Sequence, residues 1–239
     1  MLEIIGDSHI IALSEATRQG PVSSRHGEIR IAQMGHGYNF LEPFFAVEND
    51  AVSFTQPPAK TIFETINPNG PSVIHRDDPR RFVFMFGLYP SFGFDQKHWT
   101  THTAAMWSCD RHFVSKRAFD VIIDETLKQP MAFFHTLHDM NVRFSVASCC
   151  PVPASYQRIA NKLKFADGEI AFIYNRFRDR ATERLDAMGI ACHHPPAEAY
   201  DEHGAMHDLF AKQPGDYHAN SQYGRLMLEK VLREADALA

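Results

Sequence analysis

Short apolar runs that end at turn residues recur along the chain, and longer stretches with helical spacing separate them. Apolar runs of about four to eight residues, bounded by turn signals, are typical of buried parallel strands. We expect five strands, in the segments Leu2–Ile5, Glu28–Met34, Arg81–Phe86, Val142–Ser148 and Gly189–Cys192. The spacing of one buried helix face recurs in Ile10–Arg18, Phe113–Met140, Ile170–Met188 and Ser221–Ala237.

The alternation of strands with helices predicts how the sheet is built. Parallel neighbours need crossover connections, which helices usually supply. We therefore expect an α/β protein: a three-layer α/β/α sandwich around a central, mostly parallel, five-stranded sheet of the flavodoxin-like kind. In such sheets ligands bind beyond the carboxyl ends of the strands, so the loops that follow each strand are the segments in which to search for a site.

The domain organisation follows from where the motifs lie. We expect residues 1–239 to form a single domain, because the first and last strand–helix units must meet to build a site. The segment at about 40–80 stands apart, since five prolines fall between Pro57 and Pro79 among several Asn, Gly and Asp residues. This composition predicts a surface insertion, or a lid over the sheet edge.

Composition excludes several classes of protein. The 239 residues are 44% apolar and 22% charged, as in ordinary globular domains, and the formal net charge of −5 argues against a basic nucleic-acid-binding surface. No run approaches the roughly 18 apolar residues of a spanning helix. The N-terminus lacks the basic and long apolar regions of a signal peptide. We therefore expect a cytoplasmic protein with neither a nucleic acid nor a membrane as partner.

The 14 histidines and four cysteines raise the question of a metal site. His203 and His207 have the spacing of one helix face, as do His135 and His138, but neither pair carries the HExxH signature. The cysteines show no CxxC spacing, and the adjacent pair Cys149-Cys150 after an apolar run reads as buried thiols. We therefore expect no metal and no cofactor.

Two short polar motifs lie at opposite ends of the chain. Gly6-Asp7-Ser8 follows the first strand, where the Ser8 backbone N–H could face a developing oxyanion. A serine is a weak nucleophile unless a base takes its proton, and Asp216 and His218 stand just before the last helix. Only the fold could join residues 210 positions apart. The alternative interpretation is that Ser8 caps a helix and His218 is a surface or capping histidine.

This arrangement resembles the SGNH/GDSL hydrolase superfamily. Its first block carries the nucleophilic serine after the first strand, and its last block carries Asp and His before the final helix. The resemblance implies Ser8 as nucleophile, His218 as base and Asp216 as the residue that orients the imidazole. The family usually places Asp three residues before His, whereas Asp216 stands two before His218.

The resemblance also suggests oxyanion and substrate-binding residues. Gly37 after the second strand matches the glycine of the second block. The third block normally offers Gly-x-Asn-Asp, but here Gly87 is followed by Leu-Tyr-Pro, with no Asn. Asn39 or His36 could supply the missing side-chain donor, and His9 could open the helix and touch substrate or pack in the core.

The function implied by the resemblance is a serine esterase that acts through an acyl-enzyme on small O-acyl esters, with esters of carbohydrates among the candidate substrates. An O-acyltransferase acting on a glycan would use the same chemistry. A non-catalytic module that binds a glycan or a protein is the alternative from another class, since the third-block Asn is absent. The sequence predicts neither the acyl chain, the acceptor nor the oligomeric state.

Overall fold

The computed structural model describes residues 1–239 except 23, 26, 68–69, 71, 90–98, 100, 105–109, 161–164, 167 and 238–239. Cys109 therefore lies outside the described residues. Within the part that is described, no helix combines the length and the apolarity needed to cross a bilayer.

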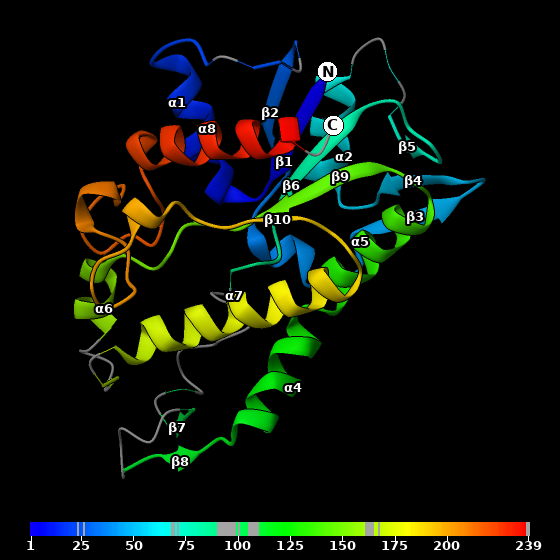
Figure 1. Ribbon diagram of the computed structural model, residues 1–239. Coiled ribbons are helices and arrows are strands. Elements are labelled where there is room, and N and C mark those ends of the chain that lie inside the picture. The colour runs from blue at the N-terminus through cyan, green and yellow to red at the C-terminus, as the bar shows by residue number, and fades with distance from the viewer. Residues whose placement is uncertain are drawn as a thin grey trace.

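A five-stranded sheet forms the centre of the molecule (Figure 1). Its strands are β1 (Leu2–Gly6), β2 (Ile29–Gln33), β6 (Arg81–Met85), β9 (Arg143–Ala147) and β10 (Cys192–His193). They lie in the order β10-β9-β6-β1-β2, and every pairing is parallel. The predicted α/β fold class is confirmed, and the strand order is the flavodoxin-like one.

Helices cover this sheet. The described helices are α1 (Ile11–Arg18), α2 (Pro57–Ile66), α4 (Lys116–Thr126), α5 (Lys128–Asp139), α6 (Ala154–Ala160), α7 (Glu169–Ala187) and α8 (Ser221–Ala237). The chain moves from β1 to β2 in one direction along the sheet and onward to β6, β9 and β10 in the other. Right-handed crossovers therefore place α1 on one face and the later connecting helices on the opposite face. Helix α8 packs directly against α1 (Figure 1).

Phenylalanine accounts for much of the core. Phe84 and Phe86 at the end of β6 are fully buried and meet Phe133 and Phe134 of α5. Phe40 stacks on Phe86 with ring centroids 4.2 Å apart and an interplanar angle of 6°. Aromatic pairs of this kind stabilise a core beyond the burial of their area. The cluster anchors the loops that follow β2 and β6, both of which reach the carboxyl edge of the sheet.

Several boundaries differ from the sequence prediction. Helix α8 has the predicted bounds, but the predicted Phe113–Met140 helix is two helices, α4 and α5, which meet at Leu127. The predicted strand at Gly189–Cys192 is wrong in position, since β10 comprises Cys192–His193. Gly189 has φ +71° and lies just beyond the end of α7, a conformation that favours glycine and terminates helices.

The segment at about 40–80 has its own secondary structure. Strands β3 (Phe45–Glu48), β4 (Ala51–Phe54) and β5 (Ile74–His75) form a small antiparallel sheet, and α2 packs against both β4 and β2. The prolines at the start of α2 occupy the first helical turn, where the missing N–H costs no hydrogen bond. A role for this segment as a lid stays a prediction.

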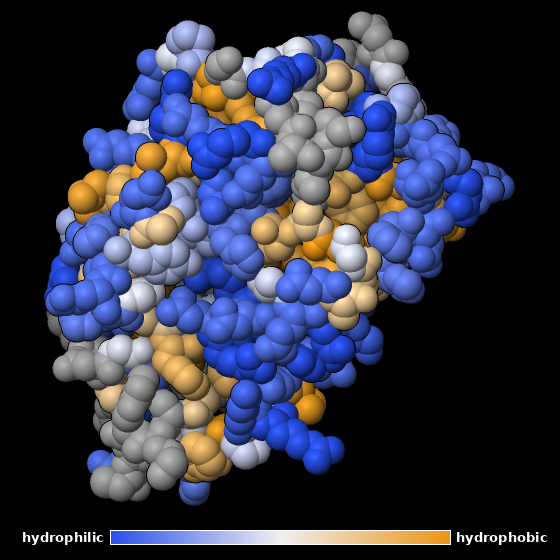
Figure 2. Space-filling model, in the orientation of Figure 1, coloured by the Kyte–Doolittle hydropathy of each residue, from blue (hydrophilic) through white to orange (hydrophobic). Residues whose placement is uncertain are grey.

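Two short strands and a charged helix surface complete the description. Strands β7 (His102–Thr103) and β8 (His112–Phe113) pair with each other. Arg176 of α7 pairs with Asp120 of α4, and Arg180 and Arg184 pair with Asp124, one helical turn along. Figure 2 shows the outer face of α7 as largely hydrophilic. The predicted amphipathic α7 therefore turns its charged side to solvent and to α4.

The contact between α1 and α8 generates a stability prediction. A Cβ added at Gly224 would lie 1.9 Å from the backbone oxygen of Ala12 and 2.3 Å from its carbonyl carbon. Backbone cannot move aside as a flexible side chain can, so Gly224→Ala forces the helices apart. We expect it to lower the free energy of unfolding by about 1–3 kcal/mol in urea denaturation.

Gly20→Ala is the matched control, because an added Cβ there meets nothing within 4 Å. It should change stability by no more than about 0.5 kcal/mol. A Gly224→Ala protein as stable as the Gly20→Ala protein would show that the two helices do not pack this closely.

Candidate active site

Ser8 lies at the point where β1 ends and the first helical turn begins. It is the first residue of a 3-10 helix, Ser8–Ile10, that leads directly into α1. The Asp7 side chain caps this helix by accepting a hydrogen bond from the His9 amide at 2.9 Å. Gly6 is required by crowding, since a Cβ there would lie 2.4 Å from the backbone oxygen of Met85 on β6. The Gly-Asp-Ser motif is thus explained by a tight strand end followed by a capped turn.

His218 reaches Ser8 from the loop that precedes α8. Its Nε2 lies 3.0 Å from Ser8 Oγ, within hydrogen-bond distance across 210 residues of sequence. Its Nδ1 lies 2.8 Å from Oδ1 of Asp216. The structure therefore brings together the three residues that the sequence analysis named as nucleophile, base and orienting acid.

The two-residue spacing from Asp216 to His218 is accommodated by a turn. Oδ1 of Asp216 accepts hydrogen bonds from both the backbone N–H of His218, at 2.9 Å, and its ring. Burial raises the pKa of the Asp216 carboxyl, but these two hydrogen bonds outweigh it, so the pKa lies below its usual value. Asp216 is therefore ionised near neutral pH and suited to hold the Nδ1–H tautomer.

Asn220 anchors this loop to α8. Its Oδ1 accepts hydrogen bonds from the amides of Gln222 and Tyr223, as a helix N-cap does, while its Nδ2 donates to the carbonyl oxygens of Leu209 and Ala211. The sequence analysis gave Asn220 no role. The signal that could have found it is an Asn immediately before the predicted start of the last helix.

Three of the four predicted oxyanion and substrate-binding residues line one small cavity of about 10 Å³ beside Ser8. These are His9, Gly37 and Gly87, with Asp7 on the same wall. Gly87 has φ +81°, and a Cβ there would lie 2.7 Å from Pro130 Cβ, so the turn after β6 needs glycine.

The fourth predicted residue, Asn39, holds the turn that contains Gly37. Asn39 Oδ1 accepts the His36 amide at 2.8 Å, and the Asn39 amide donates back to the His36 carbonyl. Asn39 is absent from the described residues that line the small cavity. The other suggested donor, His36, is exposed and stacks on Tyr38 with ring centroids 5.5 Å apart.

His9 lies behind His218 in a buried aromatic stack. Its ring centroid is 4.1 Å from that of Tyr89, the residue at the expected third-block position, and 4.9 Å from that of His218. Its Nδ1 lies 3.5 Å from Cys150 Sγ. Burial, and secondarily the charge of His218, hold the pKa of His9 well below its ordinary value, so His9 is neutral. Burial also raises the pKa of Asp7 to about 7.

Two further buried residues, Cys150 and Arg178, make hydrogen bonds to the loops around the site. The Cys150 thiol donates to the carbonyl oxygen of Tyr217, and burial raises its pKa to about 12. Arg178 of α7 is buried and donates to Ser148 Oγ, with further hydrogen bonds to Asn175 and Tyr200. Arg178 is thus turned inward, toward the loop that follows β9, whereas the other arginines of α7 pair with α4.

A second serine–histidine–acid series occurs elsewhere in the sheet. His193 Nε2 lies 2.8 Å from Ser145 Oγ, and its Nδ1 lies 2.7 Å from Glu234 Oε2 on α8. Ser145 is 4% exposed and lies within β9 rather than beyond its end. This series ties the sheet to α8 and offers no approach for a substrate. Hydrogen-bond geometry alone therefore does not identify an active site.

The predicted histidine pairs give no three-ligand cluster among the described residues. His135 and His138 are exposed around Asp139, and His203 and His207 are exposed in a loop region. Neither pair belongs to a group of three His, Cys, Asp or Glu residues close enough to share an ion, as far as the structure is described.

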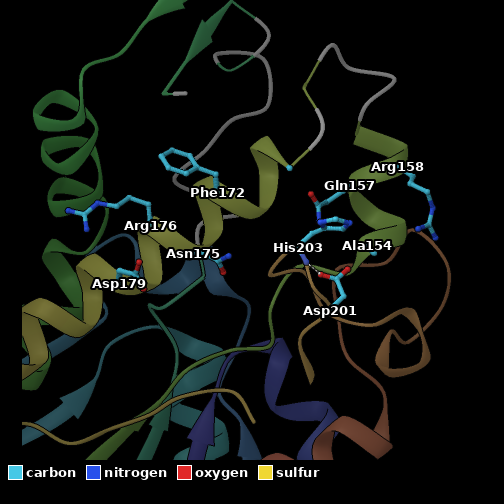
Figure 3. A pocket seen from close by; sticks show the side chains of 10 residues that line it. Ala154, Gln157, Arg158, Phe172, Asn175, Arg176, Asp179, Asp201 and His203 are labelled. Carbon is cyan, nitrogen blue, oxygen red and sulfur yellow. Dashed lines mark hydrogen bonds between the residues drawn. The ribbon is translucent and has the colours of Figure 1, made fainter. Parts of the chain in front are cut away.

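A cavity of about 760 Å³ has neither Ser8 nor His218 among the described residues that line it (Figure 3). One side is formed by α7, with Phe172, Asn175 and Asp179, and the other by α6 and a loop, with Gln157 and His203. The neighbouring α6 residues turn the other way: Ser155 Oγ accepts the Gly215 amide, and the Tyr156 ring lies 6.0 Å from that of Tyr217. Helix α6 therefore separates this cavity from the loop of His218.

No family model and no curated protein matches the chain. Solved structures do match it over nearly all of its length. A protein from Streptococcus pneumonia proposed to be a platelet activating factor aligns at a TM-score of 0.51 and 14% identity, covering 98% of this chain and 83% of its own.

An acetyl xylan esterase aligns at a TM-score of 0.48 and 11% identity, covering 98% of this chain and 99% of its own. The periplasmic domain of a lipopolysaccharide acetyltransferase from Salmonella ser. Paratyphi A aligns at a TM-score of 0.46 and 11% identity, covering 98% of this chain and 82% of its own. At these identities the likeness concerns the fold alone. The match to the Streptococcus pneumonia protein shows that the two chains share an α/β fold, which agrees with the fold class that we expected.

Proposed function

We propose that the protein is a serine-dependent acyl-ester hydrolase that acts on small O-acyl esters, with esters of carbohydrates among the candidates. The observation that carries the proposal is the hydrogen-bonded series Asp216–His218–Ser8. It lies beyond β1, next to the turn after β6, where the strand order reverses direction. Ligands of open α/β sheets bind at this point of the fold.

The first half-reaction forms an acyl-enzyme. Ser8 Oγ attacks the ester carbonyl while His218 Nε2, 3.0 Å away, takes the hydroxyl proton. Asp216 keeps the other ring nitrogen protonated and stabilises the imidazolium that forms. The tetrahedral intermediate collapses, the bond to the leaving alcohol breaks, and His218 returns the proton to that alcohol. Ser8 is left as an ester of the acyl group.

The second half-reaction releases the acyl group. A water molecule loses a proton to His218 and attacks the acyl carbonyl, and the free carboxylic acid leaves as Ser8 recovers its proton. A sugar hydroxyl in place of water would give acyl transfer with the same residues. Hydrolysis and transfer therefore differ in the acceptor that reaches the acyl-enzyme, and product analysis with and without an added sugar separates them.

The oxyanion is stabilised by backbone amides in this proposal. Ser8 and Gly37 are each the first residue of a 3-10 helix, where the amide N–H has no acceptor within the helix. Gly37 lines the small cavity that Asp7 and His9 also line, on either side of Ser8 in sequence. Two such donors can stabilise a developing negative charge without a side-chain donor from the third block.

Removal of the nucleophile or the base tests the proposal. With a short-chain chromogenic ester, Ser8→Ala and His218→Ala should each lower kcat/KM by about 10³-fold or more, because the two residues act as a unit. A serine-reactive fluorophosphonate should add its mass to the peptide containing Ser8 in the wild type and not in Ser8→Ala.

Ser145→Ala is the matched control, because Ser145 Oγ lies at a similar distance from a histidine ring nitrogen, but Ser145 is within β9 rather than beyond the end of a strand. It should retain wild-type activity per folded molecule. Undiminished turnover by Ser8→Ala would overturn the nucleophile assignment, and glycan binding without any turnover in the wild type would favour the binding-module alternative.

Asp216 gives a second, graded test. Asp216→Asn keeps an oxygen for the His218 amide but offers an uncharged amide to the ring, so the imidazole loses its preferred tautomer and its counter-charge. We expect kcat/KM to fall by about 10²–10⁴-fold. Asp201→Asn is the control, since Oδ1 of Asp201 accepts the backbone amides of His203 and Ala205 within a loop. Equal activities of the two variants would remove Asp216 from the mechanism.

A further inference from the structure

A second set of chemically reactive side chains lies directly beneath Ser8. One ligand atom from each of Asp7, His9 and Cys149 lies within 4.8 Å of the other two, and all three residues are buried. Asp7 and His9 are the neighbours of Ser8 in sequence, while Cys149 follows β9 and arrives from across β6. The mechanism proposed above uses none of these three side chains as acid, base or nucleophile.

The donor set suits a thiophilic divalent cation. A thiolate sulfur, an imidazole nitrogen and a carboxylate oxygen are the three ligand types that Zn²⁺ takes in proteins, at about 2.0–2.3 Å. Ligand atoms around a tetrahedral zinc ion are then about 3.3–3.8 Å apart. From a separation of at most 4.8 Å, the three atoms need to approach one another by about 1–1.5 Å or less. Rotations of the side chains can supply such movements.

The charges at this position leave a carboxylate without a counter-ion. Asp7 is 1% exposed, and it forms no salt bridge within the described part of the chain. Its one hydrogen bond there is from the His9 amide to Oδ1, so Oδ2 is available. Burying a charged carboxylate without a paired charge is costly, and a bound cation would offset that cost. The positive charge of Arg178 favours the Cys149 thiolate and partly opposes the cation.

Space for an ion adjoins two of the ligands. The small cavity of about 10 Å³ beside Ser8 is lined by both Asp7 and His9. That volume is about the size of a single water-sized sphere. The cavity therefore provides an approach to the ligands and room for one ion or for its fourth, water ligand.

We propose that Asp7, His9 and Cys149 form a binding site for one thiophilic divalent cation, of which Zn²⁺ is the example. On binding, the Cys149 thiol loses its proton to solvent and a sulfur–metal bond forms, while Asp7 and a ring nitrogen of His9 complete three protein ligands. Because Asp7 and His9 flank Ser8 in sequence, the bound ion restricts the movement of Ser8. The ion also shifts the His9 ring, whose centroid lies 4.9 Å from that of His218. If the proposed hydrolase activity is correct, the ion inhibits it.

The test measures binding itself, so it does not depend on the activity. The full-length chain, stripped of metal and kept reduced, is titrated with Co²⁺ and followed by absorption, since thiolate–cobalt bonds absorb in the near ultraviolet. Zn²⁺ is then titrated by calorimetry. We expect one ion per chain, and we expect Cys149→Ser to abolish the thiolate band and to weaken Zn²⁺ binding at least ten-fold. Asp7→Asn should weaken binding to a similar extent.

Two control variants make the outcome specific. Cys192→Ser should keep both the band and the affinity, because the Cys192 thiol lies outside the three-ligand set. Ser8→Ala should bind as the wild type does, although it is expected to be inactive, which separates failure of this site from failure of the proposed function. If Cys149→Ser does not fold, Asp7→Asn decides. A thiolate band that is absent from the wild type, or that survives Cys149→Ser, overturns the proposal.

Discussion

The close packing of α1 against α8 is the constraint on which the rest of the site depends. Gly224 lets the backbone of α8 approach Ala12 on α1 so closely that no side chain fits between them. Ser8 stands just before α1, and His218 just before α8. The contact lies near the first turns of both helices, so it also sets the separation of the two residues that precede them. A hydrogen bond across 210 residues is thereby formed between short, well-anchored segments.

Each of those segments is held by a side-chain cap. Asp7 caps the turn that presents Ser8, and Asn220 caps the helix that follows His218. Asp216 combines two functions in one residue, since the same oxygen accepts the backbone amide and the ring of His218. The spacing of two residues between Asp216 and His218 is compatible with an oriented imidazole. The turn that these residues form places the Asp216 carboxylate next to the His218 ring without an additional residue between them. Pre-organised contacts of this kind lower the entropic cost of catalysis.

Position relative to the sheet distinguishes the candidate site from its buried counterpart. Ser145, His193 and Glu234 have nearly the same hydrogen-bond distances as Ser8, His218 and Asp216. Ser145, however, lies within a strand, whereas Ser8 lies beyond the end of one. At the carboxyl edge, residues of the loops after β1, β2 and β6 line a small cavity. Inside the sheet, the same three groups serve only to join β9 and β10 to α8.

Packing brings three buried reactive side chains together, two of which are the sequence neighbours of Ser8. Asp7 and His9 occupy their positions because the turn at Ser8 needs a cap and the ring of His218 needs a packing partner. Cys149 comes close to them because β9 ends at the same edge of the sheet. Each of the three residues is placed by a different structural contact, and together they form the proposed ligand set. Their separation along the chain does not predict that they meet.

The amino-acid sequence determined the architecture, the approximate strands and the bounds of α8, because apolar periodicity and turn residues report burial directly. It also singled out Ser8, His218 and Asp216. A motif directly after a strand of a parallel sheet lies at the carboxyl edge, where ligands of such sheets bind. It missed β3, β4 and β5, misplaced β10, and could not say that Asn39 holds a turn. Those features depend on partners distant in the chain. Tertiary structure alone decided which serine–histidine pair lies beyond a strand end and which lies within a strand. It also decided which acidic, imidazole and thiol groups meet, because close approach is a property of the packed sheet and not of any local segment.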